Sequence, residues 1–169
     1  YYIQQFELAG ANLSEKDKVK MKKINEELAV LSTSFSNKLL LARKNGAVFF
    51  EDEKELAGLN PEDIAAAKEK AKEAGKTGNL IGLLNTTQQP FLQNLTNRAS
   101  REKIYKASWN RAEKNDDADT RETLEKMAKL RLQKANLMGK KSFAEWRMQD
   151  QMAENPTNAL HLLAQIAKP

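Results

Sequence analysis

Residue types that carry hydrolytic chemistry are scarce in this sequence. It holds one histidine, His161, and no cysteine. A hydrolytic zinc site needs several imidazole or carboxylate ligands, commonly from a His-Glu-x-x-His helix that places two imidazoles on one face. One histidine cannot build that motif, and only Glu154 carries a carboxylate near it in the sequence. We therefore expect His161 to be an ordinary residue of a helix face, with contact to a functional cleft as the weaker alternative.

Nucleophilic and phosphate-binding motifs are also missing from the sequence. A serine nucleophile needs a base and a sharp Gly-x-Ser-x-Gly turn, and the sequence has no such turn. Gly75, Gly78 and Gly82 lack the Gly-Lys-Ser/Thr ending of a phosphate-binding loop. The sequence therefore assigns no catalytic, substrate-binding or metal-binding residue to this chain.

Three groups of side chains could have either a role in binding or an ordinary structural role. Arg98 and Arg101 could pair with the carboxylate of a peptide, although surface pairing with Glu102 is favoured. Trp109 and Trp146 could line a peptide groove, but large aromatic residues on such helices usually lie in the core. Core packing is likewise favoured over an adaptable binding surface for four methionines: Met127, Met138, Met148 and Met152.

Hydrophobic spacing predicts helices at both ends of the chain. Ser14 is expected to begin a long helix with one buried stripe: Met21, Ile24, Leu28, Leu31, Phe35, Leu39 and Ala42. Residues 120–138 are expected to form a helix that Gly139 ends, followed by an antiparallel helix capped by Ser142. Phe143, Trp146 and Met152 would form the apolar side of that second helix.

The middle of the chain predicts two short strands and three helices. Residues 47–50 and 80–84 are expected to pair antiparallel. Between them, Asn60 and Pro61 open a helix that ends at Gly75 and offers little to a core. The next helix is expected to open at Gln89-Pro90. Ser100 is expected to cap the helix after it, whose packing residues would be Ile104, Tyr105, Ala107, Ser108 and Trp109.

The last predicted helix begins at Asn155-Pro156, and three of its residues are expected inside: Leu160, Leu163 and Ile166. Together these segments predict a mainly α-helical fold, an antiparallel helical array with one short two-stranded pair. The first residues also have an apolar helical character without a cap before them: Tyr1, Tyr2, Ile3, Phe6 and Leu8. This beginning favours a chain cut from a longer one.

Composition bounds the function classes. A chain of 169 residues with 40% hydrophobic and 30% charged residues is ordinary for a soluble globular domain. The net charge of +5 could suggest a nucleic-acid partner, but the lysines of residues 16–23 alternate with acidic residues, which favours a solvated helix face. No apolar run reaches the roughly 20 residues that span a bilayer. We expect no nucleic-acid or membrane partner, and a cytoplasmic location with the periplasm as the alternative.

Three stretches resemble a known family in the same order along the chain. They are GANLSEKDKVKMKKINEELAVLSTSFSNKLL, NTTQQPFLQNLTNRASREKIYKASWNRAEKND and LRLQKANLMGKKSFAEWRMQDQMA. The last of them resembles most specifically the segment before the active site in zinc oligopeptidases of the thimet oligopeptidase family, peptidase family M3. Within that family, the bacterial peptidyl-dipeptidase (dipeptidyl carboxypeptidase) branch is the most similar. None of the three stretches is a catalytic motif.

The resemblance implies an almost wholly helical peptidase whose two parts are divided by a deep channel for short peptides. Its zinc ligands would belong to a His-Glu-x-x-His helix downstream of the matched region. In the peptidyl-dipeptidase branch, zinc-activated water would release C-terminal dipeptides. Residues 1–169 would then be a single helical fragment, truncated at both ends, that forms channel wall and is inactive alone.

Two other functions remain open from the residues. The favoured alternative is a stand-alone helical module that binds a protein or peptide, and a weaker one is a basic nucleic-acid binder. Steep salt dependence of binding would distinguish the nucleic-acid binder.

Overall fold

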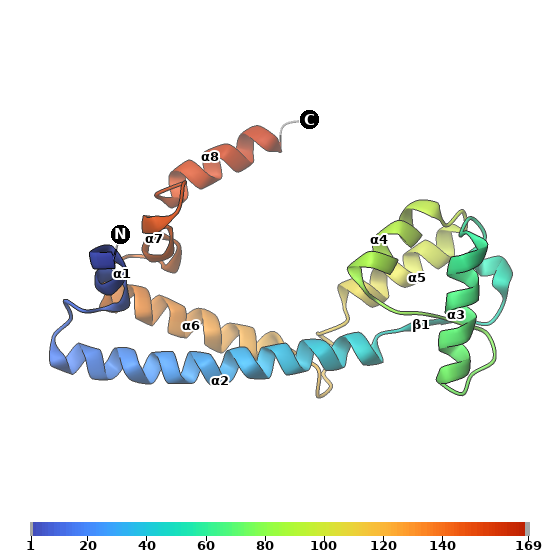
Figure 1. Ribbon diagram of the computed structural model, residues 1–169, viewed down its shortest axis with the longest axis horizontal. Coiled ribbons are helices and arrows are strands. Elements are labelled where there is room, and N and C mark those ends of the chain that lie inside the picture. The colour runs from blue at the N-terminus through green and yellow to red at the C-terminus, as the bar shows by residue number, and fades with distance from the viewer. Residues whose placement is uncertain (1, 168–169) are drawn as a thin grey trace. The chain divides into compact units, whose positions relative to one another are not determined.

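The structure is a computed structural model that describes residues 2–167, with the side chains of residues 85–87 left out. As predicted, it is mainly α-helical with one antiparallel pair of strands among the described residues (Figure 1). The elements in chain order are α1 (Tyr2–Ala9), α2 (Glu15–Asn45), β1 (Val48–Phe50), η1 (Glu53–Leu56), α3 (Pro61–Glu73), β2 (Asn79–Ile81), α4 (Asn85–Asn94), α5 (Arg98–Trp109), α6 (Arg121–Leu137), α7 (Phe143–Arg147), η2 (Met148–Asp150) and α8 (Pro156–Ile166). Tyr1, which the sequence assigns to the apolar start, lies outside the described residues.

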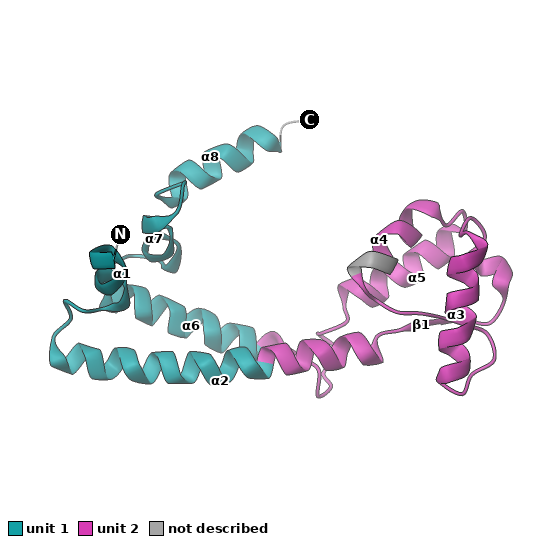
Figure 2. Ribbon diagram, in the orientation of Figure 1, with its two compact units in different colours: residues 1–34, 122–169 teal, residues 35–121 magenta. Residues whose placement is uncertain are grey.

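The chain divides into two compact units (Figure 2). Unit 1 consists of residues 1–34 and 122–169, and unit 2 consists of residues 35–121. Helix α2 contributes residues to both. No helix in the described part of the chain combines the length and the apolarity needed to cross a membrane.

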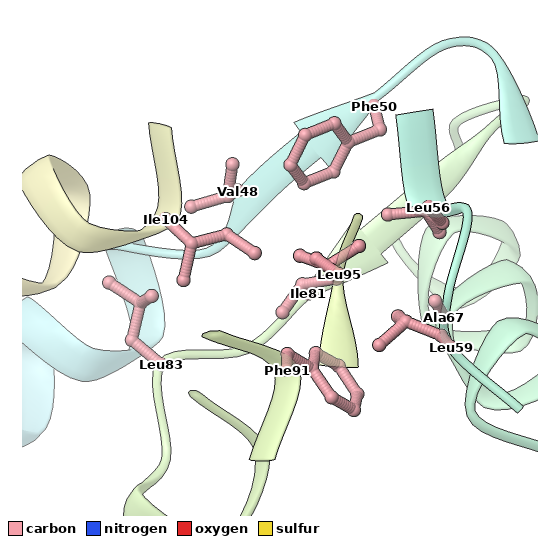
Figure 3. Close-up of a cluster of buried hydrophobic side chains, with 10 residues drawn as sticks. All are labelled: Val48, Phe50, Leu56, Leu59, Ala67, Ile81, Leu83, Phe91, Leu95 and Ile104. Atoms are coloured by element: carbon pink, nitrogen blue, oxygen red, sulfur yellow. The ribbon is translucent and has the colours of Figure 1, made fainter. Parts of the chain in front are cut away.

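Unit 2 contains the main hydrophobic core. Its two strands pair antiparallel as predicted, with Val48 opposite Ile81 and Phe50 opposite Asn79. The second strand begins and ends earlier than expected, because Leu83 leaves the ladder to enter the core. Figure 3 shows the buried side chains turned toward one another between the strands and helices. The core cluster comprises Val48, Phe50, Leu56, Leu59, Ala67, Ile81, Leu83, Phe91, Leu95 and Ile104.

Helix α3 corrects one expectation. Its start is as predicted, because the Oδ1 atom of Asn60 accepts a hydrogen bond from the amide of Asp63 at 2.8 Å. However, Ala67 and Ala71 are buried, and Ile64 packs against the core. Small side chains allow a helix to approach its neighbours closely, so α3 contributes to the core although Ile64 is its one large apolar residue there.

Two helix starts in unit 2 differ from prediction. Helix α4 begins at Asn85, before the expected start at Gln89-Pro90, and contains Pro90 within it. Helix α5 is capped by Asn97, whose Oδ1 atom accepts hydrogen bonds from the amides of residues 99 and 100 at 2.9 and 3.3 Å. Ser100, the expected cap, is instead buried inside the helix.

The turn after η1 is held tightly against the end of α4. The amide and the hydroxyl of Thr96 both donate to the carbonyl oxygen of Ala57, at 2.8 and 3.0 Å. Gly58 lies beside this junction with a φ of +100°. A Cβ atom at position 58 would lie 2.1 Å from the carbonyl oxygen of Asn94. Glycine is therefore required here both for its backbone angle and for its size.

Unit 1 confirms the predicted helix boundaries at three points. The Oγ atom of Ser14 accepts from the amide of Asp17 at 3.2 Å, and the Oγ atom of Ser142 accepts from the amide of Glu145 at 3.1 Å. Gly139 follows α6 with a φ of +71°. Beyond Ser142, α7 is a helix of only 5 residues that continues as the 3-10 turn η2.

Several apolar residues of unit 1 that we expected inside are exposed. In α8, whose Asn155 cap and Pro156 start are as predicted, Leu160, Leu163 and Ile166 are 64%, 60% and 71% exposed. Met152 is fully exposed as well. Because no described residue covers these side chains, the prediction that they lie inside is wrong for this chain. Met127 is buried, and Met138 and Met148 are partly buried.

The loop before α6 yields a prediction about pH. Asp119 accepts hydrogen bonds from the amides of Asn115 and Arg121, at 2.9 and 3.0 Å, and pairs with the guanidinium of Arg121. The hydrogen bonds from Arg121 are the main reason that the pKa of Asp119 lies well below its usual value. A carboxyl group whose pKa is lower in the folded than in the unfolded state stabilises the fold at pH values above its unfolded pKa of about 4. This stabilisation is lost as the pH falls from there toward the folded pKa.

We therefore expect Asp119→Asn to lower the urea midpoint of unfolding at pH 7, and the deficit to shrink steadily below about pH 4. Urea unfolding at several pH values measures this. Asp117→Asn, at an exposed position of the same loop, is the control. A deficit that stays constant down to pH 2 would contradict the explanation.

Candidate functional site

The outer face of α5 carries the two arginines that the sequence singles out, and the structure gives them different roles. Nη1 of Arg101 donates to the carbonyl oxygens of Leu95 and Thr96, at 2.6 and 2.9 Å, so this side chain holds the end of α4. Arg98 is exposed. Glu102, the expected partner of these arginines, forms its ion pair with Lys106 at 2.6 Å. That hydrogen bond is the main cause of its lowered pKa, and the charge of Arg98 adds less.

A surface hollow of about 450 Å³ lies beside this face. Its lining consists of Leu92 from α4 and of Arg98, Arg101, Glu102 and Tyr105 from α5. Because Glu102 is neutralised by Lys106, the guanidinium groups leave the hollow positively charged. Such a surface can hold an apolar side chain while Arg98 pairs with a carboxylate.

Two aromatic rings extend the same face by one turn. Tyr105 and Trp109 stack with their ring centroids 5.8 Å apart, and they are 50% and 74% exposed. The prediction that both residues belong to the core is therefore wrong. Ile104 faces the core. Tyr105 and Trp109 lie one and five positions further along α5, so they point away from the core and form an i, i+4 pair. Stacked, exposed aromatic rings are a surface on which an extended peptide can lie.

In unit 1, Trp146 is half-buried and joins three helices. Its Nε1 atom donates to the carbonyl oxygen of Leu8 in α1 at 3.3 Å. The Nζ atom of Lys134 in α6 lies 4.7 Å from the centroid of its ring and donates to Oδ1 of Asn25 in α2 at 2.8 Å. Burial lowers the pKa of the Lys134 ammonium group.

Potential metal ligands lie apart from one another in the part of the chain that the structure describes. Among them, no three His, Cys, Asp or Glu side chains gather as ligands of one metal ion. His161 lies exposed on α8, as an ordinary helix-face residue does.

Comparison with known proteins shows which family the chain resembles. Residues 91–169 match the profile of peptidase family M3. The chain is 45% identical to the dipeptidyl carboxypeptidase of Escherichia coli K12 over 164 residues, which are 96% of this chain and 24% of that protein. This chain is related to the M3 peptidases. The dipeptidyl carboxypeptidase of Salmonella typhimurium is 44% identical over 98% of the chain, and the oligopeptidase A of Haemophilus influenzae is 33% identical over 98%.

The M3 resemblance inferred from the three sequence stretches is thereby confirmed. The chain spans about a quarter of the length of these M3 relatives.

Sequence reasoning missed Lys134, although a signal for it was present. Arg131 and Lys134 of α6 have the same three-residue spacing as Phe143 and Trp146 of α7. In the structure each cation lies over one of these rings, Arg131 at 5.3 Å and Lys134 at 4.7 Å from the ring centroid. Two matched pairs on helices joined by a short turn could have predicted these contacts.

Proposed function

We propose that this chain is a helical part of a zinc metallopeptidase that cleaves short peptides and releases C-terminal dipeptides. In this proposal the chain supplies channel wall and support, while the zinc ligands belong to another part of the enzyme. The 45% identity to a dipeptidyl carboxypeptidase over 96% of this chain is the observation that carries the proposal. We propose a cytoplasmic location, with the periplasm as the alternative.

The outer face of α5 is our candidate for the part of the wall that touches substrate. It combines an apolar hollow, the exposed guanidinium of Arg98 and the stacked pair Tyr105 and Trp109. A peptide has an apolar and a carboxylate component that match these groups. The face lies away from the core cluster, so substitutions on it can change binding without unfolding unit 2.

The test is a chimera in which this chain replaces the matching segment of the Escherichia coli dipeptidyl carboxypeptidase. We expect the chimera to release dipeptides from a short blocked peptide, and the isolated chain to release none with or without added zinc. Replacing both Tyr105 and Trp109 with alanine in the chimera should raise KM several-fold at an unchanged melting temperature. Loss of one peptide contact worth about 1 kcal/mol corresponds to roughly fivefold.

Two outcomes would contradict the proposal. Zinc-dependent hydrolysis by the isolated chain would place catalytic groups within it. A chimera that folds with the melting temperature of the parent enzyme but is inactive would show that this chain does not serve as wall. Tight peptide binding by the isolated chain, together with that inactive chimera, would favour the alternative of a stand-alone peptide-binding module.

A further inference from the structure

Lys134 is a half-buried cation whose charge has no counter-ion among the described residues. Its ammonium group donates to the neutral amide of Asn25 and lies over the ring of Trp146. Other lysines of α6 pair with carboxylates one turn away, Lys126 with Glu122 and Lys129 with Glu125. Burial lowers the pKa of this ammonium group. Placing a charge in a poorly solvated position is costly unless an opposite charge joins it.

A hollow of about 300 Å³ opens beside this ammonium group within unit 1. The residues that line it include Gln5, Asn25, Lys134, Trp146, Arg147 and Asp150. Arg147 and Asp150 pair with each other at 3.1 Å, so their charges cancel. The charge of Lys134 is therefore the one that the hollow presents to a ligand.

The chemistry of the walls limits what can enter. The ammonium group of Lys134 attracts an anion, and the ring of Trp146 offers an apolar surface to a group beside that anion. Nε2 of Gln5 already donates to Oδ2 of Asp150 at 3.3 Å, and Oδ1 of Asn25 accepts from Lys134. Oε1 of Gln5 and Nδ2 of Asn25 are the amide atoms that can hydrogen-bond a peptide unit. A volume of about 300 Å³ holds a molecule the size of a dipeptide and excludes a folded protein.

We propose that this hollow binds the C-terminal carboxylate of a short peptide, with Lys134 as the cation and Trp146 as the wall for the terminal side chain. The site is separate from the face of α5. The site is formed by side chains of unit 1 alone, so binding at it can be tested independently of the proposed peptidase function.

The test uses Trp146 as its own reporter. The chain has two tryptophans, so Trp109→Phe leaves Trp146 as the single emitter. In this background the chain is titrated with glycyl-leucine and, in parallel, with glycyl-leucinamide, which lacks the carboxylate. We expect a saturable change in emission with the acid, and binding about tenfold or more weaker with the amide, because a hydrogen bond to a charged group is worth about 1.5–3 kcal/mol.

Matched variants separate charge from packing. Lys134→Gln should weaken glycyl-leucine binding about tenfold or more, whereas Lys134→Arg, which keeps the charge, should retain it. Lys129→Gln, at an exposed position of the same helix, should have no effect. The absence of saturable binding, equal binding of acid and amide, or loss of binding in both Lys134 variants with an unchanged circular dichroism spectrum would each overturn the proposal.

Discussion

Gly58→Ala is expected to lower the free energy of unfolding of unit 2 by about 3–5 kcal/mol. Two costs add at this position. The backbone has a φ of +100°, which L side chains rarely adopt, and the new Cβ atom would lie 2.1 Å from the carbonyl oxygen of Asn94. The contact is with main chain, which is itself fixed by the hydrogen bonds between Thr96 and Ala57. The clash can therefore be relieved only if the turn after η1 separates from the end of α4.

Gly75→Ala is the matched control for this prediction. Gly75 also has a positive φ, +68°, but its Cβ atom would meet nothing within 4 Å. Gly75→Ala should therefore lower the free energy of unfolding only by the cost of a positive φ at an alanine, about 1–2 kcal/mol. Urea unfolding followed through Trp109 in a Trp146→Phe background reports on unit 2 and measures both variants. Equal losses at positions 58 and 75 would show that the close contact with Asn94 does not matter.

Ile104→Ala is expected to lower the free energy of unfolding by about 2–5 kcal/mol. Ile104 is fully buried and touches the core between the strands and α4. Alanine is a better helix former than isoleucine, so α5 itself should not be weakened and the loss should come from the cavity.

Tyr105→Ala supplies the comparison for the buried position next to it. Tyr105 lies on the same helix and is 50% exposed. We therefore expect Tyr105→Ala to lower the free energy of unfolding by less than about 1 kcal/mol. Chemical denaturation of the two variants side by side gives the difference directly. Similar values for Ile104→Ala and Tyr105→Ala would mean that the interior of unit 2 is less tightly packed than the structure indicates.

Local signals in the sequence were sufficient for most of the fold. The caps at Ser14, Asn60, Ser142 and Asn155 each predict a helix start that the structure has, because the cap hydrogen bond is made within four residues. The pairing of two strands was likewise readable from their residue types. By contrast, Ser100 is buried within α5, since Asn97 makes the cap three residues earlier.

Burial was harder to predict than helix position, because it depends on which elements surround a face. Trp109 and Leu163 have the residue type and spacing of core positions, yet both are exposed among the described residues. Lys134 is the reverse case: a charged residue type that suggests solvent but lies against an aromatic ring. Both candidate sites depend on these exceptions, because the exposure of Trp109 and the half-burial of Lys134 are set by the surrounding elements.

The division into two units has a consequence for the order in which the chain can fold during synthesis. Unit 2 is one continuous segment, residues 35–121, whereas unit 1 needs residues 122–169 to complete what residues 1–34 begin. The ribosome therefore delivers the whole of unit 2 before the second part of unit 1 exists. The core of unit 2 can therefore close first, while residues 1–34 wait for residues 122–169 to complete unit 1.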